Sequence, residues 1–156
     1  MKIAAEALAV AYAHAREAYP EEACGLFVGP RGGDGVDEAR RCENLQNALH
    51  AEDPEANRRD ARTAYSLGAR DLIFLDRSQR TERPVRVVYH SHVEVGAYFS
   101  AKDKDDALLF GEPRFPVDYL VVDTKKVDGV VRVAGAKLFR FDGAEFVEVA
   151  AYPGES

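Results

Sequence analysis

Two histidines separated by one residue are the feature of this sequence that most directly suggests chemistry. His90 and His92 stand on either side of Ser91, and on an extended chain the side chains of residues i and i+2 point to the same face. Two imidazoles on one face can bind the same ion. Zinc accepts histidine nitrogens at about 2.0 Å, and catalytic zinc sites use three protein ligands and keep a fourth position for water. A third ligand is therefore expected nearby.

Asp103 can supply the third ligand. The residues that follow His90 have the spacing His-x-His-x7-Ser-x2-Asp, in which the serine is Ser100. A connection of this length can return the chain to the end of the strand, and a helix that begins near Asp103 would hold the carboxylate in place. The prediction is a site for one zinc ion with His90, His92 and Asp103 as ligands. Ser100 could donate a hydrogen bond to the oxyanion of a tetrahedral intermediate.

A hydrolytic zinc site also needs a group that takes a proton from water and later gives it to the leaving amine. Glu21 and Glu22 directly precede a short apolar run at residues 24–28. If this run forms a strand beside residues 85–89, a carboxylate that precedes it reaches the site. Local chemistry does not choose between the two glutamates.

The segment Pro-Glu-Glu-Ala-Cys-Gly-Leu at residues 20–26, together with the later histidines, serine and aspartate, resembles the JAMM (MPN+) metallopeptidases. That family has a distal glutamate followed by His-Ser/Thr-His-x7-Ser-x2-Asp. Five functional residue types stand at the family's spacings here. The resemblance runs from the first predicted helix to the helix after Asp103.

The resemblance implies that His90, His92 and Asp103 bind zinc. It selects the second of the two glutamates, Glu22, as the general base, and it assigns oxyanion stabilisation to Ser100. The implied fold is the cytidine-deaminase-like α/β/α sandwich. The implied reaction is hydrolysis of an isopeptide or peptide bond after the C-terminal tail of a ubiquitin-like or sulfur-carrier β-grasp protein.

Two residues depart from the pattern of many small bacterial members, which carry proline after the second histidine and before the serine. This chain has Val93 and Phe99 at those positions. Residues 94–99 are expected to line the cleft, so the departures affect which substrate tail fits. Two alternatives stay open: a non-catalytic MPN scaffold, whose members typically lack the ligands, and a zinc hydrolase of small peptide or cysteine adducts.

The two cysteines and the two remaining histidines have no partners at metal-ligand spacing. Cys24 and Cys42 lie outside any CxxC motif and are expected to be free, buried thiols, with Cys24 structural and not a nucleophile. His14 and His50 are expected at the surface or in an interface. Ser91 is expected to orient neighbouring groups. A zinc deaminase would need a Pro-Cys-x-x-Cys motif, which is missing.

Apolar periodicity and turn residues predict a mixed α+β domain in which helices flank a central sheet. Residues 1–150 are expected to form one domain and residues 151–156 a tail. The polar residues 46–63 are expected to form a loop. Helices are expected at residues 3–19, 69–77 and 103–110. Strands are expected at residues 24–28, 36–45, 64–67, 85–89, 117–122, 129–141 and 145–149, with turns at 125–126 and 142–143.

The charge and hydropathy of the chain exclude several classes of function. Its 156 residues include 21 Lys and Arg against 27 Asp and Glu, which gives a net charge of −6. An acidic surface repels phosphate, so nucleic acid is not an expected partner. No apolar stretch approaches about 18 residues, and charged residues interrupt the N-terminal run, so neither a membrane span nor an export signal is expected. These features predict a cytoplasmic protein with reduced cysteines.

Overall fold

A six-stranded mixed sheet forms the centre of the molecule in a computed structural model, which describes residues 1–155 of the chain. The strands of this sheet are β2 (Cys24–Val28), β4 (Glu38–Cys42), β5 (Val85–Val93), β8 (Asp118–Val127), β9 (Val130–Phe141) and β10 (Phe146–Pro153). They follow the order β10-β9-β8-β5-β2-β4. β5 and β8 are parallel, and the other neighbouring strands of the sheet are antiparallel.

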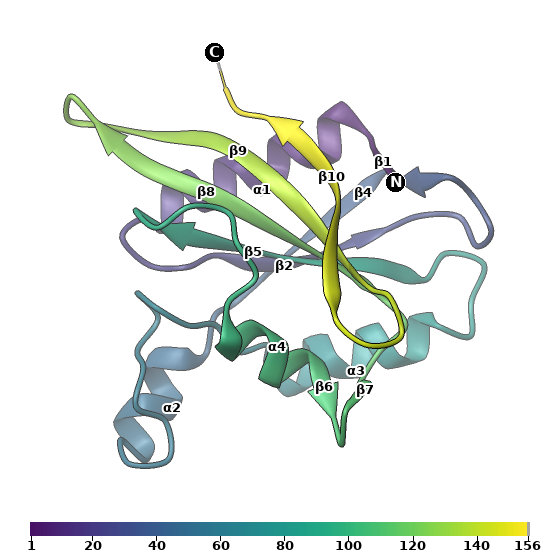
Figure 1. Cartoon of the computed structure of the whole chain (residues 1–156), viewed down its shortest axis with the longest axis horizontal. Coiled ribbons are helices and arrows are strands. Elements are labelled where there is room, and N and C mark those ends of the chain that lie inside the picture. Colours follow the sequence, from purple (N-terminus) through teal and green to yellow (C-terminus); the bar gives the residue numbers. More distant parts are fainter. Residues whose placement is uncertain (156) are drawn as a thin grey trace.

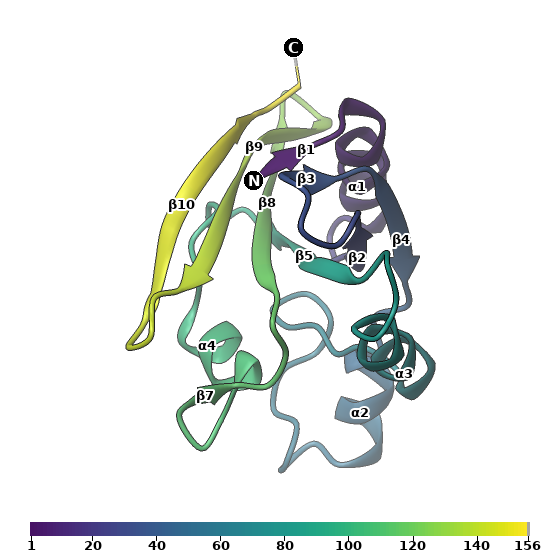
Figure 2. The ribbon, with the colours of Figure 1, turned by 90° about the vertical axis from the view of Figure 1, so that its right-hand side faces the viewer.

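Helices cover both faces of the sheet. The helices are α1 (Ala5–Ala18), α2 (Gln46–Glu52), α3 (Ala69–Ser78) and α4 (Ala101–Ala107). Figures 1 and 2 show α1 on one side of the sheet, and α3 and α4 on the other. Two short strand pairs lie outside the sheet: β1 (Lys2–Ile3) with β3 (Gly35–Val36), and β6 (Leu108–Leu109) with β7 (Glu112–Pro113). The predicted α/β/α sandwich with a central mixed sheet is confirmed.

β5 occupies the centre of this arrangement and is buried on both faces. Val87 and Tyr89 pack on the side of α1, in the same cluster as Ala11. Val88 points to the opposite face and belongs to the cluster of Leu75 from α3. Side chains of a strand alternate between faces, so a strand covered on both sides is apolar along its whole length. The polar residues at the end of β5 therefore lie inside the protein.

Gly25 in β2 makes room for the buried ring of Tyr89, its partner across the β2–β5 pair. A Cβ atom on Gly25 would lie 2.2 Å from a ring carbon of Tyr89. The ring cannot easily move, because Tyr89 is fully buried and its hydroxyl group lies 2.7 Å from Nδ1 of His14. Only glycine fits at this position.

We expect Gly25→Ala to lower the free energy of unfolding by about 2–3 kcal/mol, the range of forced overpacking in a core. Denaturant titration of the purified variant measures this change. Gly68→Ala is the matched control, because its Cβ would meet only the end of the Leu45 side chain, at 3.1 Å. Equal stability of the two variants would contradict the steric argument.

Residues 46–63 contain a helix, so the prediction of a loop there is wrong. α2 covers Gln46–Glu52, and Oδ1 of Asn44 accepts the N–H of Gln46 at its first turn, at 3.0 Å. Apolar periodicity does not reveal this helix because Gln46 is its only buried residue. The predicted strand at residues 64–67 is not formed. The side chain of Asn44 and a backbone hydrogen bond from Leu45 to Ser66 hold that segment, and it pairs with no strand within residues 1–155.

The predicted helix at residues 103–110 is wrong at both ends. α4 begins at Ala101, directly after its N-cap Ser100, and ends at Ala107. The chain then turns back at Phe110 and Gly111, both of which have positive φ angles, 52° and 79°. β6 and β7 pair around this turn, and the pairing ends the helix before the glycine.

The strand boundaries also differ from those predicted. β5 and β8 pair as far as Val93 and Thr124, and β8 runs through the predicted turn at residues 125–126 to Val127, so the turn lies at residues 128–129. The predicted strand 36–45 divides into β3 and β4.

Both ends of the chain also differ from the prediction. The first helix is shorter than residues 3–19, because Ile3 belongs to β1. β10 continues to Pro153, which pairs with Gly135, so residues 151–153 belong to the sheet and not to a tail; Ser156 lies outside the described residues. The strand at residues 24–28 and the turn at 142–143 are confirmed. None of the helices in residues 1–155 has the length and apolarity that crossing a membrane requires.

Candidate metal centre

Three side chains on two elements converge on one point inside the protein. His90 and His92 lie on the same face of β5, and their Nε2 atoms are 3.2 Å apart. Oδ2 of Asp103, in the first turn of α4, lies 3.2 Å from Nε2 of each histidine. The three residues are at most 5% exposed. The structure therefore brings together the three residues that the sequence predicts as ligands.

The triangle formed by these atoms has the size of one face of a zinc coordination shell. In a tetrahedral shell with bonds of 2.0 Å, two ligand atoms are about 3.3 Å apart. The three distances of 3.2 Å between His90, His92 and Asp103 agree with this separation. Two imidazole nitrogens and one carboxylate oxygen are also a donor set that zinc accepts in catalytic sites. The residues present fit a zinc ion.

The hydrogen bonds around His92 direct its free lone pair into the triangle. Nδ1 of His92 donates to the carbonyl oxygen of Gly96 at 3.0 Å, so the neutral ring carries no proton on Nε2. An outer hydrogen bond of this kind fixes the tautomer and orientation of a metal-binding histidine. The carbonyl oxygen of His92 accepts a further bond from Thr124, at 2.6 Å. The ring of Tyr98 stands edge-on to His92 at 5.0 Å.

The protonation states also suit a cation. Burial lowers the pKa of His90 below its ordinary value, which favours the neutral ring. Burial alone would raise the pKa of Asp103, but the neighbouring His90 and the hydrogen bond from the amide of Ser100 lower it well below its usual range. Metal ligands must be deprotonated. At neutral pH these two groups already are.

The first turn of α4 fixes the carboxylate of Asp103. Its backbone N–H donates to Oγ of Ser100 at 3.0 Å, and its Oδ2 accepts the N–H of Ser100 at 2.9 Å. This reciprocal pair is a capping box, which satisfies two N–H groups at the start of a helix. In it, Ser100 Oγ serves as an acceptor, so its hydroxyl hydrogen remains able to donate to another group.

Glu22 lies beside the two histidines, whereas Glu21 points elsewhere. Ligand atoms of Glu22, His90 and His92 lie within 4.8 Å of one another. Glu22 is 6% exposed, and burial, followed by the charge of Asp103, raises its pKa to about 9. The carboxylate of Glu21 instead accepts a hydrogen bond from Asn47 at 2.7 Å. The geometry separates two glutamates that the residues alone do not distinguish.

Pairing between β2 and β5 places Glu22 at this position. Cys24 lies opposite His90 in the antiparallel register. Beyond the end of that pairing, the N–H of Ala23 donates to Oγ of Ser91 at 2.8 Å, and the N–H of Ser91 donates to the carbonyl oxygen of Ala23 at 3.0 Å. Ser91 thus ties the chain next to Glu22 to the strand that carries both histidines.

The buried carboxyl group of Glu22 should make the metal-free protein less stable as pH rises. The folded state keeps its proton up to about pH 9, whereas the unfolded chain releases it near the ordinary glutamate pKa of 4.5. Between these values the unfolded state binds fewer protons, so the free energy of unfolding falls with pH. We expect Glu22→Gln to remove this term and to stabilise the metal-free protein by on the order of 1–3 kcal/mol at pH 8, but not at pH 4.

Urea unfolding in the presence of a chelator, repeated across this pH range, measures the difference. Glu21→Gln serves as the control, because its side chain is partly exposed and bonded to Asn47. A constant difference between wild type and Glu22→Gln at all pH values would contradict the raised pKa.

Asn44 is the residue near the site that sequence reasoning misses. Its Nδ2 donates to the carbonyl oxygens of Glu22 and Ala64, at 2.9 and 3.1 Å. Its Oδ1 accepts the N–H groups of Gln46 and Ser66, at 3.0 and 3.1 Å. The side-chain amide of Asn44 therefore links the backbone of Glu22 to the backbone on both sides of residue 65. Its position between β4 and a polar segment gives no periodic signal that would have revealed this role.

Tyr65 covers one face of His90. Asn44 fixes its position through hydrogen bonds to the backbone of the residues before and after it. The two rings stack with their centroids 4.4 Å apart and an interplanar angle of 20°. Nδ1 of His90 has no hydrogen-bond partner among residues 1–155, so the ring is held by stacking and by its neighbours in the sheet.

The two cysteines and the other two histidines of the sequence lie outside the site. Cys24 and Cys42 are free and buried, and burial raises the pKa of Cys24 to about 12, as expected of unreactive thiols. The partly buried His14 bonds the hydroxyl group of Tyr89, and Nδ1 of His50 bonds the carbonyl oxygen of Asn57 at 2.7 Å. Neither histidine joins the metal centre.

Comparison with known proteins places the chain in a family. Residues 4–133 match the family of prokaryotic homologs of the JAB domain. The chain is 33% identical, over 115 residues, to proteins named CysO-cysteine peptidase from Mycobacterium tuberculosis and Mycobacterium bovis. That alignment covers 72% of this chain and 66% of those relatives, slightly less than two thirds of their length.

Solved structures share the fold. A protein from Salinibacter ruber superposes with a TM-score of 0.59 at 27% identity, covering 96% of this chain and 89% of that one. The JAB1/MPN domain protein AF2198 from Archaeoglobus fulgidus superposes with a TM-score of 0.53 at 19% identity, covering 96% of this chain and 95% of that one. The architecture, the converging residues and the match over most of its length agree: the chain belongs to the prokaryotic JAB-domain family.

Proposed function

We propose that this chain is a zinc-dependent peptidase that cleaves an amide bond after the C-terminal tail of a sulfur-carrier or other ubiquitin-like β-grasp protein. The observation that carries the proposal is the buried triangle of His90, His92 and Asp103, with edges of 3.2 Å, beside the carboxyl group of Glu22. The relatives named CysO-cysteine peptidase support a peptidase that acts on a cysteine adduct of a carrier protein. In this proposal one domain performs the reaction.

His90, His92 and Asp103 would hold the zinc ion. When bound, zinc polarises the scissile carbonyl group and lowers the pKa of water at its open position. A cation beside Glu22 would oppose the effects of burial and of Asp103 on its pKa and bring its carboxylate into the base form near neutral pH. Glu22 would then accept the proton of the attacking water and pass it to the leaving amine.

Ser100 would donate its hydroxyl hydrogen to the oxygen on which negative charge develops. Its Oγ already accepts the N–H of Asp103, which fixes the oxygen and leaves the hydrogen free. Residues 94–99 would contact the substrate tail, because Gly96 and Tyr98 in this segment contact His92. Val95 and Tyr98 are 60% and 52% exposed, and both are therefore accessible to a substrate.

Hydrolysis of two matched substrates tests this function. One is a β-grasp sulfur carrier with cysteine joined by an amide bond to its glycine-rich tail; the other is the tail peptide alone with the same cysteine. We expect the zinc-loaded protein to release cysteine with a higher kcat/KM from the carrier, and a chelator to stop the reaction until zinc is restored. Cleavage of neither substrate would favour a non-catalytic scaffold. Equal cleavage of both would favour a hydrolase of small adducts.

Asn44 offers a prediction about how Glu22 is positioned. Asn44→Ala removes both hydrogen bonds that hold the carbonyl oxygens of Glu22 and Ala64. A displacement of about 1 Å at a catalytic group can cost about 100-fold in rate, so we expect turnover per zinc-loaded molecule to fall about 10- to 100-fold. Asn57→Ala is the control, because its amide donates only to the carbonyl oxygen of Leu49, at 3.3 Å.

The same substitution in a Glu22→Gln background shows whether the effect passes through Glu22. Residues that act as one unit are non-additive, so Asn44→Ala should change the residual rate of the Glu22→Gln protein little. An equal fall in both backgrounds would contradict a positioning role.

A further inference from the structure

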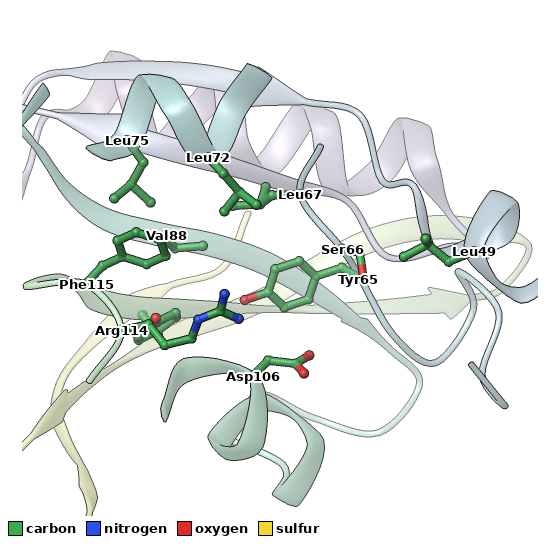
Figure 3. A pocket seen from close by; sticks show the side chains of 11 residues that line it. Leu49, Tyr65, Ser66, Leu67, Leu72, Leu75, Val88, Asp106, Arg114 and Phe115 are labelled. Atoms are coloured by element: carbon green, nitrogen blue, oxygen red, sulfur yellow. The ribbon is translucent and has the colours of Figure 1, made fainter. Parts of the chain in front are cut away.

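A cavity lined in part by Tyr65 lies next to the metal centre. The cavity has a volume of about 260 Å³ and lies between α3, β5, β8 and α4. Figure 3 shows its side chains gathered around an open centre. Its lining includes none of the residues proposed to bind zinc. It is therefore a separate site that shares one wall, Tyr65, with the metal centre.

One half of the cavity is apolar. Aliphatic and aromatic side chains from α2, α3, β5 and the flanking loops form it: Leu49, Leu67, Leu72, Leu75, Val88 and Phe115. Branched aliphatic side chains dominate this set, so the surface favours a compact apolar body. The volume lies just below the roughly 300–1,000 Å³ of pockets for drug-sized molecules. A ligand of fewer than about ten heavy atoms would fit.

The other half offers hydrogen-bond donors. Tyr65 and Tyr119 are 8% and 5% exposed, and neither hydroxyl group makes a hydrogen bond within residues 1–155, so both are free to bond a molecule in the cavity. Arg114 also lines the cavity and forms no ion pair within the described part of the chain. In Figure 3 the hydroxyl group of Tyr65 points toward the guanidinium group of Arg114.

The acidic residue of the cavity is already neutralised. Asp106 lies on its wall, but its carboxylate accepts two hydrogen bonds from Nζ of Lys102, at 2.7 and 2.8 Å. The unpaired charge of the lining is therefore the positive charge of Arg114. Guanidinium and hydroxyl groups that face the same space match a carboxylate, which accepts several hydrogen bonds at once.

We propose that this cavity binds a small carboxylate with a branched apolar body, with the carboxylate near Arg114, Tyr65 and Tyr119 and the body against the leucines. The site is additional to the proposed peptidase function. Because Tyr65 stacks on His90, an occupant also restrains the ring that covers a proposed zinc ligand. Binding itself needs neither zinc nor a peptidase substrate, so it is tested independently of the reaction.

Three probes separate the contributions of charge and of apolar body. 4-Methylpentanoate has both, 4-methylpentan-1-ol has the same body without the charge, and acetate has the charge without the body. We expect 4-methylpentanoate to bind with a dissociation constant on the order of 1 mM, as for a small ligand of moderate efficiency. The alcohol and acetate should each bind at least about tenfold more weakly. Titration followed by ¹H–¹⁵N NMR gives both the affinity and the location.

Arg114→Gln tests the charged group, and Tyr65→Phe tests a hydroxyl group while it keeps the ring on His90. We expect about tenfold weaker binding of 4-methylpentanoate to the first variant and about threefold weaker binding to the second. Arg132→Gln is the matched control, because Arg132 is an exposed residue of β9 outside the cavity lining. Its affinity should equal that of the wild type.

Three results would overturn the proposal. Absence of saturable binding at 10 mM 4-methylpentanoate would indicate that the cavity holds only water. Equal binding of the acid and the alcohol would show that no carboxylate is recognised. Equal loss in the Arg114 and Arg132 variants would show that net charge, and not the site, attracts the anion.

Discussion

Glu22→Gln is expected to lower the rate of amide hydrolysis by about 10²–10⁴-fold while the protein still binds one zinc ion. The proposed ligands do not include Glu22, whose carboxyl group lies beside His90 and His92. Glutamine keeps the size of the side chain and cannot accept the proton of water. Positioned general acid–base groups contribute about 10²–10⁴-fold. The variant should therefore separate chemistry from metal binding.

Two measurements on the same preparation check this expectation: zinc content by atomic emission, and single-turnover release of cysteine from the carrier substrate. Glu21→Gln is the matched control, since Glu21 contacts Asn47 and not the histidines. We expect that variant to react at nearly the wild-type rate. If Glu22→Gln kept the wild-type rate, or if Glu21→Gln lost it, the assignment of the base would be wrong.

His92→Gln is expected to abolish stoichiometric zinc binding and, with it, activity. Loss of a residue that only hydrogen-bonds to a metal ligand costs about 10- to 100-fold in metal affinity. Loss of one of the three proposed protein ligands should therefore cost more than about 100-fold. Glutamine is close in size to histidine but lacks the imidazole nitrogen that faces Asp103 at 3.2 Å. The fold should survive, because His92 lies near the end of β5.

The stabilising effect of zinc gives a readout that does not depend on substrate. A ligand that binds only the folded state raises stability by about 2.7 kcal/mol at 100 times its Kd, so zinc should raise the melting temperature of the wild type by several degrees. It should leave that of His92→Gln unchanged. His14→Gln, which alters a histidine that contacts Tyr89 away from the metal centre, should keep the zinc response. A full zinc response in His92→Gln would place the metal elsewhere.

The spacing of a few residues was enough to predict the triangle of the site. His90 and His92 alternate correctly on a strand, and Ser100 and Asp103 form a local capping box, so short-range geometry decides their positions. Glu22 is different. Its approach to the histidines depends on the pairing of β2 with β5, between residues far apart in the chain. The family resemblance therefore selects Glu22 in the sequence, and the structure shows its contact with the histidines.

Several elements of the fold cannot be predicted from local sequence patterns, because side-chain hydrogen bonds, unusual backbone angles or long-range pairing determine them. α2 begins at Gln46, whose N–H donates to the side-chain amide oxygen of Asn44, and it buries little surface, so it has no apolar period to detect. The short pair β6–β7 ends α4 through a turn with positive φ at Phe110, which is uncommon for a large side chain. β5 and β8 are longer than predicted because they pair with each other in parallel. Local propensity carries no information about this long-range contact.

The position of zinc itself tests the central claim most directly. Anomalous X-ray scattering, measured on either side of the zinc absorption edge from crystals grown with zinc, locates the ion without reference to activity. The predicted result is one strong peak about 2.0–2.2 Å from Nε2 of His90, Nε2 of His92 and a carboxylate oxygen of Asp103. A zinc peak bound by other residues, or none at this triangle in a zinc-saturated crystal, would contradict the assignment of these three residues as a metal centre.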